Sequence, residues 1–158
     1  MLISVLYTWG LGTNGQLGHR SFEWKKDFLS MNFYIQSEPR KLMKSKRFAR
    51  VAIGGSFTLA TTHSGELFGW GTDFLNMGKG LQSNEPVLIE VPGGKRIVDV
   101  SAGLHHAAVI DENGHLYTWG DGGNWFKGGG QLGHGSRNAE THPRLPSKRD
   151  FLFLGIIL

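Results

Sequence analysis

The feature of this sequence that most constrains its fold is a five-residue motif that occurs twice without change. Residues 6–10 and 116–120 both read Leu-Tyr-Thr-Trp-Gly, and residues 67–71 read Leu-Phe-Gly-Trp-Gly. A second motif, Gly-Gln-Leu-Gly-His, follows at residues 15–19 and again at residues 130–134. The tryptophans of the three copies are 61 and 49 residues apart. A period of about fifty residues is typical of propeller blades, so the sequence predicts a repeat protein.

Each repeat unit has the pattern of a β-hairpin. Residues 51–71 align with residues 100–120 without a gap. In the later unit a short apolar run, residues 107–110, precedes a turn that contains Asn-Gly, the strongest short-range hairpin signal. No segment has a helical period with start and stop signals. The sequence therefore predicts an all-β fold, with the two aligned segments as equivalent antiparallel hairpins in neighbouring blades.

Composition limits the classes of protein to consider. The 158 residues include 24 glycines, which cluster beside the repeat motifs and indicate many tight turns. The absence of cysteine excludes disulfides, thiolate metal sites and cysteine nucleophiles. Residues 1–7 are interpreted as a strand that leads into the first motif. The apolar residues 151–158 are too few to span a bilayer, which takes about 20 residues.

The polar residues do not form a pattern that predicts catalysis. No Gly-x-Ser-x-Gly elbow is present. The carboxylates at Asp73, Asp99, Asp111 and Asp121 are spread over turns and loops. His105 and His106 are adjacent, so in a strand they point to opposite faces, which is poor geometry for joint metal ligation. We expect no enzyme active site, no metal and no cofactor.

The order of these motifs resembles the regulator of chromosome condensation repeat, and the resemblance covers residues 5 to about 146. It implies a β-propeller of four-stranded blades, seven of them in complete members. Family roles include nucleotide exchange on small GTPases, chromatin binding, ultraviolet sensing in plants and scaffolding. The plant light sensors need a Gly-Trp-Arg-His-Thr run, whereas residues 103–107 read Gly-Leu-His-His-Ala, which disfavours that role.

Six residues at repeat positions are predicted to serve the structure of the blades. Each tryptophan supplies a large apolar area for packing between blades, and the glycines lie where a crowded backbone leaves no room for a side chain. The histidine is implied by the resemblance to be a structural residue inside the blade. These residues are Trp9, Gly54, Trp70, Gly103, His106 and Trp119.

The repeats do not complete a ring. We expect a partial repeat at residues 1–38, full repeats at about 39–85 and 86–142, and an apolar tail at 147–158 outside the pattern. Because a propeller closes with about four to eight blades, two to three repeats form an open arc. We expect its uncovered ends to make the isolated chain poorly stable, and to associate with another copy or with a partner.

Two segments are candidates for binding. Trp125, Phe126 and Lys127 lie in an extended loop, and they predict either a protein-binding hot spot or a loop that folds over its own apolar residues. A basic run is interpreted as a solvated loop between two units, with phosphates or an acidic protein face as the alternative partner. Its members are Arg40, Lys41, Lys44, Lys46, Arg47 and Arg50.

Together these patterns predict a non-catalytic repeat module that binds a protein, in a regulatory or scaffolding role. One alternative is a guanine-nucleotide exchange factor for a small GTPase, although the sequence shows no wedge hairpin of the kind that exchange-active members use. Another is chromatin or nucleic-acid binding, without specific recognition. We expect an intracellular protein, cytoplasmic or nuclear, with a mitochondrial location as the alternative.

Overall fold

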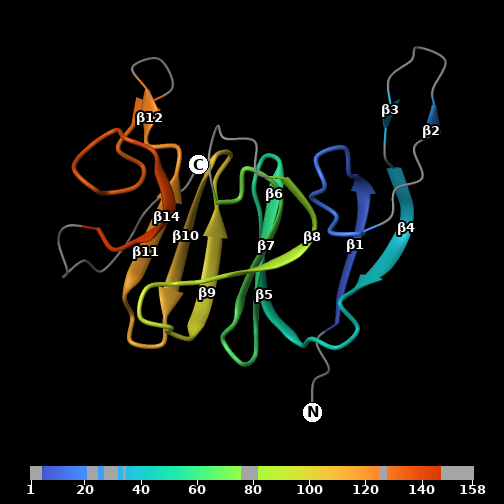
Figure 1. Ribbon diagram of the computed structural model, residues 1–158, viewed down its shortest axis with the longest axis horizontal. Helices are drawn as coiled ribbons and strands as arrows, with labels where there is room; N and C mark the ends of the chain where they lie inside the picture. Colours follow the sequence, from blue (N-terminus) through green and yellow to red (C-terminus); the bar gives the residue numbers. More distant parts are fainter. Residues whose placement is uncertain are drawn as a thin grey trace.

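The computed structural model describes residues 5–20, 25–26, 32–33, 35–75, 82–124 and 128–146. None of these residues lies in a helix, and the longer strands form three antiparallel sheets that stand side by side (Figure 1). We number the sheets as blades 1 to 3 in chain order. The predicted all-β fold of antiparallel blades is confirmed.

Blade 2 is a complete four-stranded sheet in which each strand pairs with the next one along the chain. A glycine with φ of +86°, Gly65, turns the chain between its second and third strands, and in register Thr58 faces Trp70. Glycine suits this turn because it adopts positive φ without a steric penalty. The strands are β5 (Phe48–Ile53), β6 (Phe57–Thr62), β7 (Leu67–Thr72) and β8 (Gln82–Ile89).

Blade 3 repeats this arrangement, with Ala107 opposite Trp119 as Thr58 is opposite Trp70. Gly114, with φ of +82°, makes the equivalent turn. The predicted hairpins are therefore confirmed. A small hairpin interrupts the sequence before the last strand. The strands are β9 (Ile97–Ala102), β10 (His106–Asp111), β11 (Leu116–Gly120), β12 (Gly123–Asn124), β13 (Gly128–Gly129) and β14 (Glu140–Arg144).

Blade 1 contains half of this pattern. Its two long strands, β1 (Leu6–Leu11) and β4 (Ile35–Leu42), pair with each other and correspond to the third and fourth strands of the later blades. Within the described part of the chain, no strand pairs with the other edge of β1. A short hairpin of β2 (Lys25–Lys26) and β3 (Asn32–Phe33) lies between them in the sequence and extends beyond the end of β4 (Figure 1).

The glycine that follows each repeated tryptophan shows how open the unpaired edge of β1 is. A Cβ at Gly71 or at Gly120 would collide with the backbone of the preceding strand, at Phe57 and His106 respectively. A Cβ at the equivalent Gly10 would meet nothing within 4 Å. The half blade therefore leaves the inner edge of β1 uncovered.

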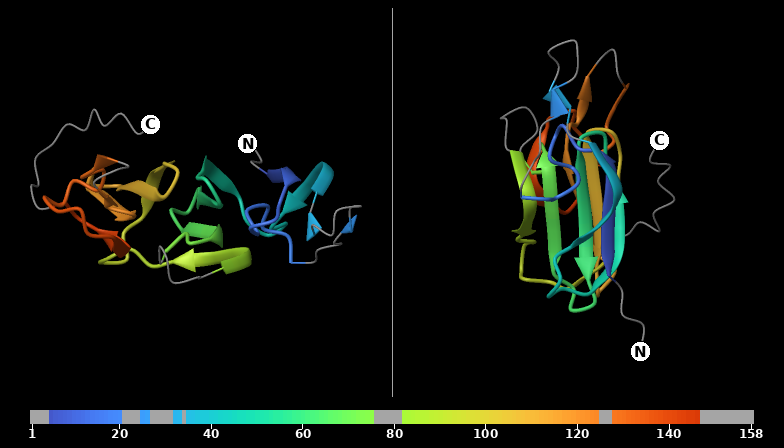
Figure 2. Two further views of the ribbon diagram at one scale, coloured as in Figure 1. Left: turned by 90° about the horizontal axis from the view of Figure 1, so that it is seen from above. Right: turned by 90° about the vertical axis from the view of Figure 1, so that its right-hand side faces the viewer.

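The apolar core lies between sheets. One cluster joins blade 1 to blade 2 and the other joins blade 2 to blade 3, as the adjacent sheets in Figure 2 indicate. The first cluster consists of Leu42, Phe48, Ala60, Phe68 and Trp70, with Leu6 and Met43 against it. The second contains Phe57, Leu59, Phe74, Ile97, Val109, Tyr117 and Trp119 among others. Each sheet therefore needs a neighbour to bury its faces.

Gly54 and Gly103 are each crowded by an aromatic ring three residues further along the chain. A Cβ at Gly54 would overlap the ring of Phe57, and a Cβ at Gly103 would overlap the ring of His106. Each glycine N–H also donates a 2.8 Å hydrogen bond to the carbonyl of that aromatic residue. The space is thus taken by a side chain inside the same blade, where the sequence suggested crowding by packed backbone.

Candidate interaction surface

The three repeated tryptophans occupy equivalent strand positions but differ in environment. Trp70 is 0% exposed, and its Nε1 donates a 2.8 Å hydrogen bond to the carbonyl of Gln16 in blade 1. Trp119 is 1% exposed, and its Nε1 donates a 2.7 Å hydrogen bond to the carbonyl of Phe74 in blade 2. Trp9 is 60% exposed. Both buried repeat tryptophans, Trp70 and Trp119, are thus covered by a loop of the preceding blade.

The described residues do not pack Trp9 between two blades, so its expected role in blade packing stays a prediction. Alternation along β1 places Trp9 on the opposite side of the strand from Leu6, which packs against the cluster shared with blade 2, and among the described residues no strand pairs with the open edge beside it. Alternation along β1 places Tyr7 and Leu11 on the same side, and both are exposed as well. Whether the tryptophan of this motif is buried depends on the neighbouring blade and not on the sequence of the motif itself.

A groove of about 340 Å³ adjoins these side chains, between β1 and the first strand of blade 2. Val51 and Ile53 of β5 form its far wall and are exposed, Ile53 at 71%. In blades 2 and 3 the first two strands of a sheet occupy the corresponding position. We call Tyr7, Trp9, Leu11, Val51 and Ile53 the blade 1 end face. It gathers large apolar side chains beside an open strand edge.

The loop of the second motif is held by its histidine. Thr8 Oγ1 donates to the carbonyl of Leu17 at 2.6 Å and lies 2.9 Å from Nε2 of His19. Burial, assisted by the charge of Arg40, lowers the pKa of His19, so its ring is neutral at pH 7. The same geometry recurs at Thr118, where His134 Nε2 lies 3.0 Å from Oγ1.

Strand β10 of blade 3 begins with His106 and ends with Asp111. Burial lowers the pKa of the half-buried His106. The carboxylate of Asp111 is buried, accepts hydrogen bonds from the backbone N–H groups of Asn113 and His115, and lies 3.1 Å from Nδ1 of His115 and 3.3 Å from the Tyr117 hydroxyl. Burial alone would raise the pKa of Asp111, but these hydrogen bonds lower it. This role of Asp111 is visible in the sequence only as an aspartate at the start of an Asp-x-Asn-Gly turn.

The basic run is divided among several elements. Arg40 and Lys41 belong to strand β4 and Arg50 belongs to β5, so only the middle of the run is a loop. Lys46 Nζ contacts both carboxylate oxygens of Glu66 at 2.6 and 2.8 Å and lies over the ring of Phe68. Arg50 forms a longer, exposed ion pair with Asp99. The solvated-loop interpretation therefore applies to Lys44 and Arg47, which are exposed in the connection.

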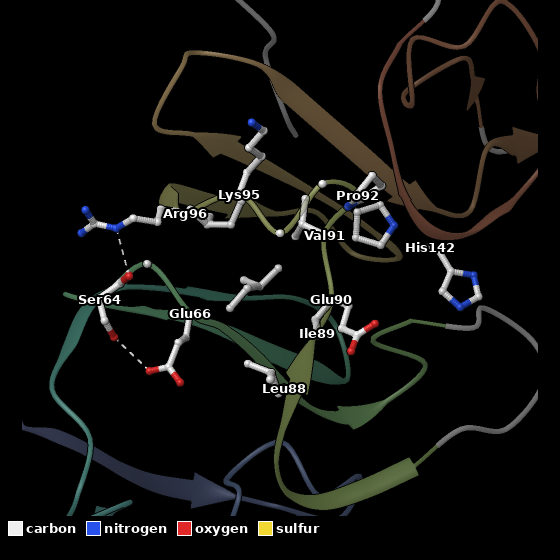
Figure 3. A pocket seen from close by; sticks show the side chains of 16 residues that line it. Ser64, Glu66, Leu88, Ile89, Glu90, Val91, Pro92, Lys95, Arg96 and His142 are labelled. Carbon is white, nitrogen blue, oxygen red and sulfur yellow. Dashed lines mark hydrogen bonds between the residues drawn. The ribbon is translucent and has the colours of Figure 1, made fainter.

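A second hollow, of about 720 Å³, opens between blades 2 and 3 (Figure 3). Three polar residues at its rim, Ser64, Glu66 and Arg96, have hydrogen-bond partners. Arg96 donates to the carbonyl of Ser64 at 3.1 Å, and Ser64 Oγ donates to Glu66 at 2.9 Å. Lys95 and Arg96 extend away from Glu90 and His142 in this view. The groups do not converge on one point, as a catalytic site requires.

Some predicted features cannot be placed. Trp125, Phe126 and Lys127 lie outside the described residues, as does the apolar tail at 147–158. Among the residues that are described, no three His, Asp or Glu side chains gather as metal ligands. A search of the same residues finds no helix long and apolar enough to cross a membrane.

Blades of four antiparallel strands, each covering the next, define the chain as part of a β-propeller. Models of the regulator of chromosome condensation (RCC1) repeat match residues 5–61, 64–110 and 97–124. The chain belongs to this family.

Curated relatives are similar over most of this chain. It is 33% identical over 145 residues to the human probable E3 ubiquitin-protein ligase HERC3, covering 87% of this chain and 12% of HERC3. It is 31% identical over 146 residues to the ultraviolet-B receptor UVR8 of Arabidopsis thaliana, covering 89% of this chain and 30% of that receptor. The chain thus spans less than a third of these relatives.

Solved structures agree on the fold. Human WBSCR16 superposes with a TM-score of 0.71 and 26% identity, covering 90% of this chain and 33% of that one. Prp20p of Saccharomyces cerevisiae, in a structure concerned with its binding to Gsp1p and histones, gives a TM-score of 0.67 at 20% identity, covering 91% and 34%. The second likeness shows the fold alone.

Proposed function

We propose that this chain is a non-catalytic propeller-repeat module that binds a protein through the blade 1 end face. The observation that carries the proposal is the exposure of Trp9 beside Tyr7, Leu11 and Ile53, when both equivalent tryptophans are buried. Tryptophan and tyrosine contribute disproportionately to binding energy at protein interfaces. The open backbone edge of β1 adds main-chain donors and acceptors, which can pair with a strand of a partner.

The experiment compares proteins captured by the immobilised chain with those captured by Trp9→Ala. The matched control is Leu88→Ala, because Leu88 is 52% exposed on strand β8, away from the end face. Each candidate partner is then purified and its affinity measured by calorimetry. We expect a partner whose affinity falls about 30-fold in Trp9→Ala and stays within twofold in the control. The proposal fails if no purified partner distinguishes the two variants.

A small-GTPase exchange factor is the second candidate, and the protruding β2–β3 hairpin favours it, since such a hairpin can act as a wedge (Figure 1). The test is release of a fluorescent guanine nucleotide from purified small GTPases at increasing chain concentration. The non-catalytic proposal predicts no acceleration over spontaneous release. Acceleration that disappears when residues 25–33 are replaced by a short glycine-serine turn would establish the exchange function instead.

A further inference from the structure

The hollow between blades 2 and 3 lies where the edge strands of two complete blades approach each other. β8 is the last strand of blade 2 and β14 is the last strand of blade 3, and within the described part of the chain no strand pairs with the outer edge of either. Leu88 and Ile89 of β8 and His142 and Pro143 of β14 line the hollow. Its volume of about 720 Å³ falls within the usual range of ligand sites, about 300–1,000 Å³.

The floor of the hollow is apolar. Leu67, Val91 and Ile97 line it and are buried, whereas Leu88, which also lines it, is 52% exposed. An edge strand offers backbone donors and acceptors to an extended peptide, and apolar space beside the strand can accept one of the peptide's side chains. The hollow therefore suits a peptide in β conformation that carries an apolar side chain.

The connection between blades 2 and 3 supplies an unpaired positive charge. In the gapless alignment of the two blades, Lys46 corresponds to Lys95 and Glu66 corresponds to His115. The Lys46 ammonium lies 2.6 Å from a carboxylate oxygen of Glu66, and its hydrogen bond lowers the pKa of Glu66. In blade 3 a histidine takes the place of that glutamate, and no described Asp or Glu lies within ion-pair distance of Lys95. The charge of Lys95 is therefore left for a ligand.

Contacts between the blades fix Arg96 beside this lysine. The Nε of Arg96 donates to the carbonyl of Ser64 at 3.1 Å, and a terminal nitrogen donates to the carbonyl of His63 at 3.2 Å. Both acceptors are neutral, so the guanidinium keeps its full charge. The glycines at residues 93–94 have φ of +78° and +60°, which suits a tight turn directly before Lys95. The connection thus carries a cationic rim, formed by Lys95 and Arg96, on one part of the hollow.

From these observations we propose that the hollow binds an extended segment of another protein in which an acidic side chain lies next to an apolar one. The carboxylate pairs with Lys95 and Arg96, the apolar side chain contacts Leu88, and the backbone pairs with the outer edge of β8. Glu90 also lines the hollow, and Figure 3 shows the two basic side chains extending away from it, so the segment is acidic at one end only. This site is separate from the blade 1 end face and does not depend on the proposed function.

The test selects peptides from a displayed library of random short sequences on the immobilised full chain. The most enriched peptides are synthesised with a fluorescent label, and fluorescence anisotropy measures their affinities. We expect the enriched sequences to share an Asp or Glu close to a large apolar residue. Their affinity should fall as the salt concentration rises, because the cationic rim is exposed and its charges are screened.

Four variants locate the bound peptide. Lys95→Glu reverses one charge of the cationic rim and should weaken binding about tenfold. Leu88→Ala removes the apolar contact and should weaken binding about fivefold. Lys44→Glu is the matched control, because Lys44 is an exposed lysine in the connection between blades 1 and 2 and its reversal changes the net charge equally. Lys44→Glu and Trp9→Ala should both stay within about twofold of wild type, and circular dichroism checks that all variants keep their strands.

A library that yields no binding peptide, or only peptides without an acidic residue, overturns the inference. Equal affinity in wild type, Lys95→Glu and Leu88→Ala also overturns it. Duplex DNA serves as a competitor: a DNA affinity equal to that of the peptides, weakened by Lys95→Glu and unchanged in Leu88→Ala, would show a site for any polyanion and refute the peptide site. Binding that only Trp9→Ala weakens places the peptides on the blade 1 end face, which refutes this inference and supports the proposed function.

Discussion

Adding one methyl group at Gly18 should destabilise this chain far more than the same change at Gly133. Both glycines have nearly the same positive φ, so an alanine costs about 1 kcal/mol of backbone strain at either position. At Gly18 the new Cβ would also lie 2.9 Å from Trp70 Nε1 and 3.1 Å from Leu42. Displacing the ring adds overpacking of about 1–3 kcal/mol, and about 1 kcal/mol for the hydrogen bond to Gln16.

We therefore expect Gly18→Ala to lower the free energy of unfolding by about 3–5 kcal/mol and Gly133→Ala by about 1 kcal/mol. Urea unfolding followed by tryptophan fluorescence measures both losses, at chain concentrations low enough to keep the protein monomeric. The two variants control for each other, since only the packing between blades separates them. Equal losses would refute the claim that the loop over Trp70 is a tightly packed interface.

Three further predictions concern other parts of the molecule. Replacing Trp119 by phenylalanine removes the indole donor to the Phe74 carbonyl, and replacing Trp70 removes one of two donors to the Gln16 carbonyl, the other being the Thr58 hydroxyl. Each change should cost about 1–3 kcal/mol, whereas Trp9→Phe should change the unfolding free energy of the monomer by less than about 0.5 kcal/mol; three similar values in urea unfolding would contradict this. The pKa of Asp111 is lower in the folded chain than in the unfolded chain, so its contribution is present at neutral pH and is lost as pH falls through the acidic range; the unfolding free energy of Asp111→Asn should depend less on pH between 7 and 3, and parallel pH curves would count against this role. Fluorescence anisotropy should show that duplex DNA binds weakly, with a steep salt dependence and no sequence preference. Sequence-selective binding at physiological salt that disappears on neutralising Lys44, Lys46 and Arg47 would contradict the prediction that the basic run gives no specific DNA recognition.

Much of the fold follows from local patterns in the sequence. The gapless alignment of residues 51–71 with 100–120 predicted both hairpins, because turn glycines and alternating side chains act within a few residues. The repeat signal also predicted that the sheets form an open arc. The division into units at residues 38, 85 and 142 remains a prediction.

The environment of the candidate site could not be predicted in the same way. Residues 6–10 and 116–120 are identical, yet Trp9 is exposed and Trp119 is buried, because burial here is a property of the neighbouring blade. The basic run shows the same limit. Its charges predicted one solvated loop, but Arg40 lies in strand β4 and Arg50 lies in strand β5. Glu66 is 20 residues from Lys46 in sequence, and the two side chains meet only in the folded chain. Contacts between distant residues decide these outcomes.

The most direct test of the open end face is hydroxyl-radical footprinting of the three repeated tryptophans, read by peptide mass spectrometry. They lie in one chain at equivalent positions, so each is an internal control for the others. In dilute protein, we predict that Trp9 is oxidised at least about tenfold faster than Trp70 and Trp119, and that association or a bound partner slows oxidation at Trp9 alone. Equal oxidation of the three tryptophans, or a Trp9 rate that binding leaves unchanged, would contradict the account.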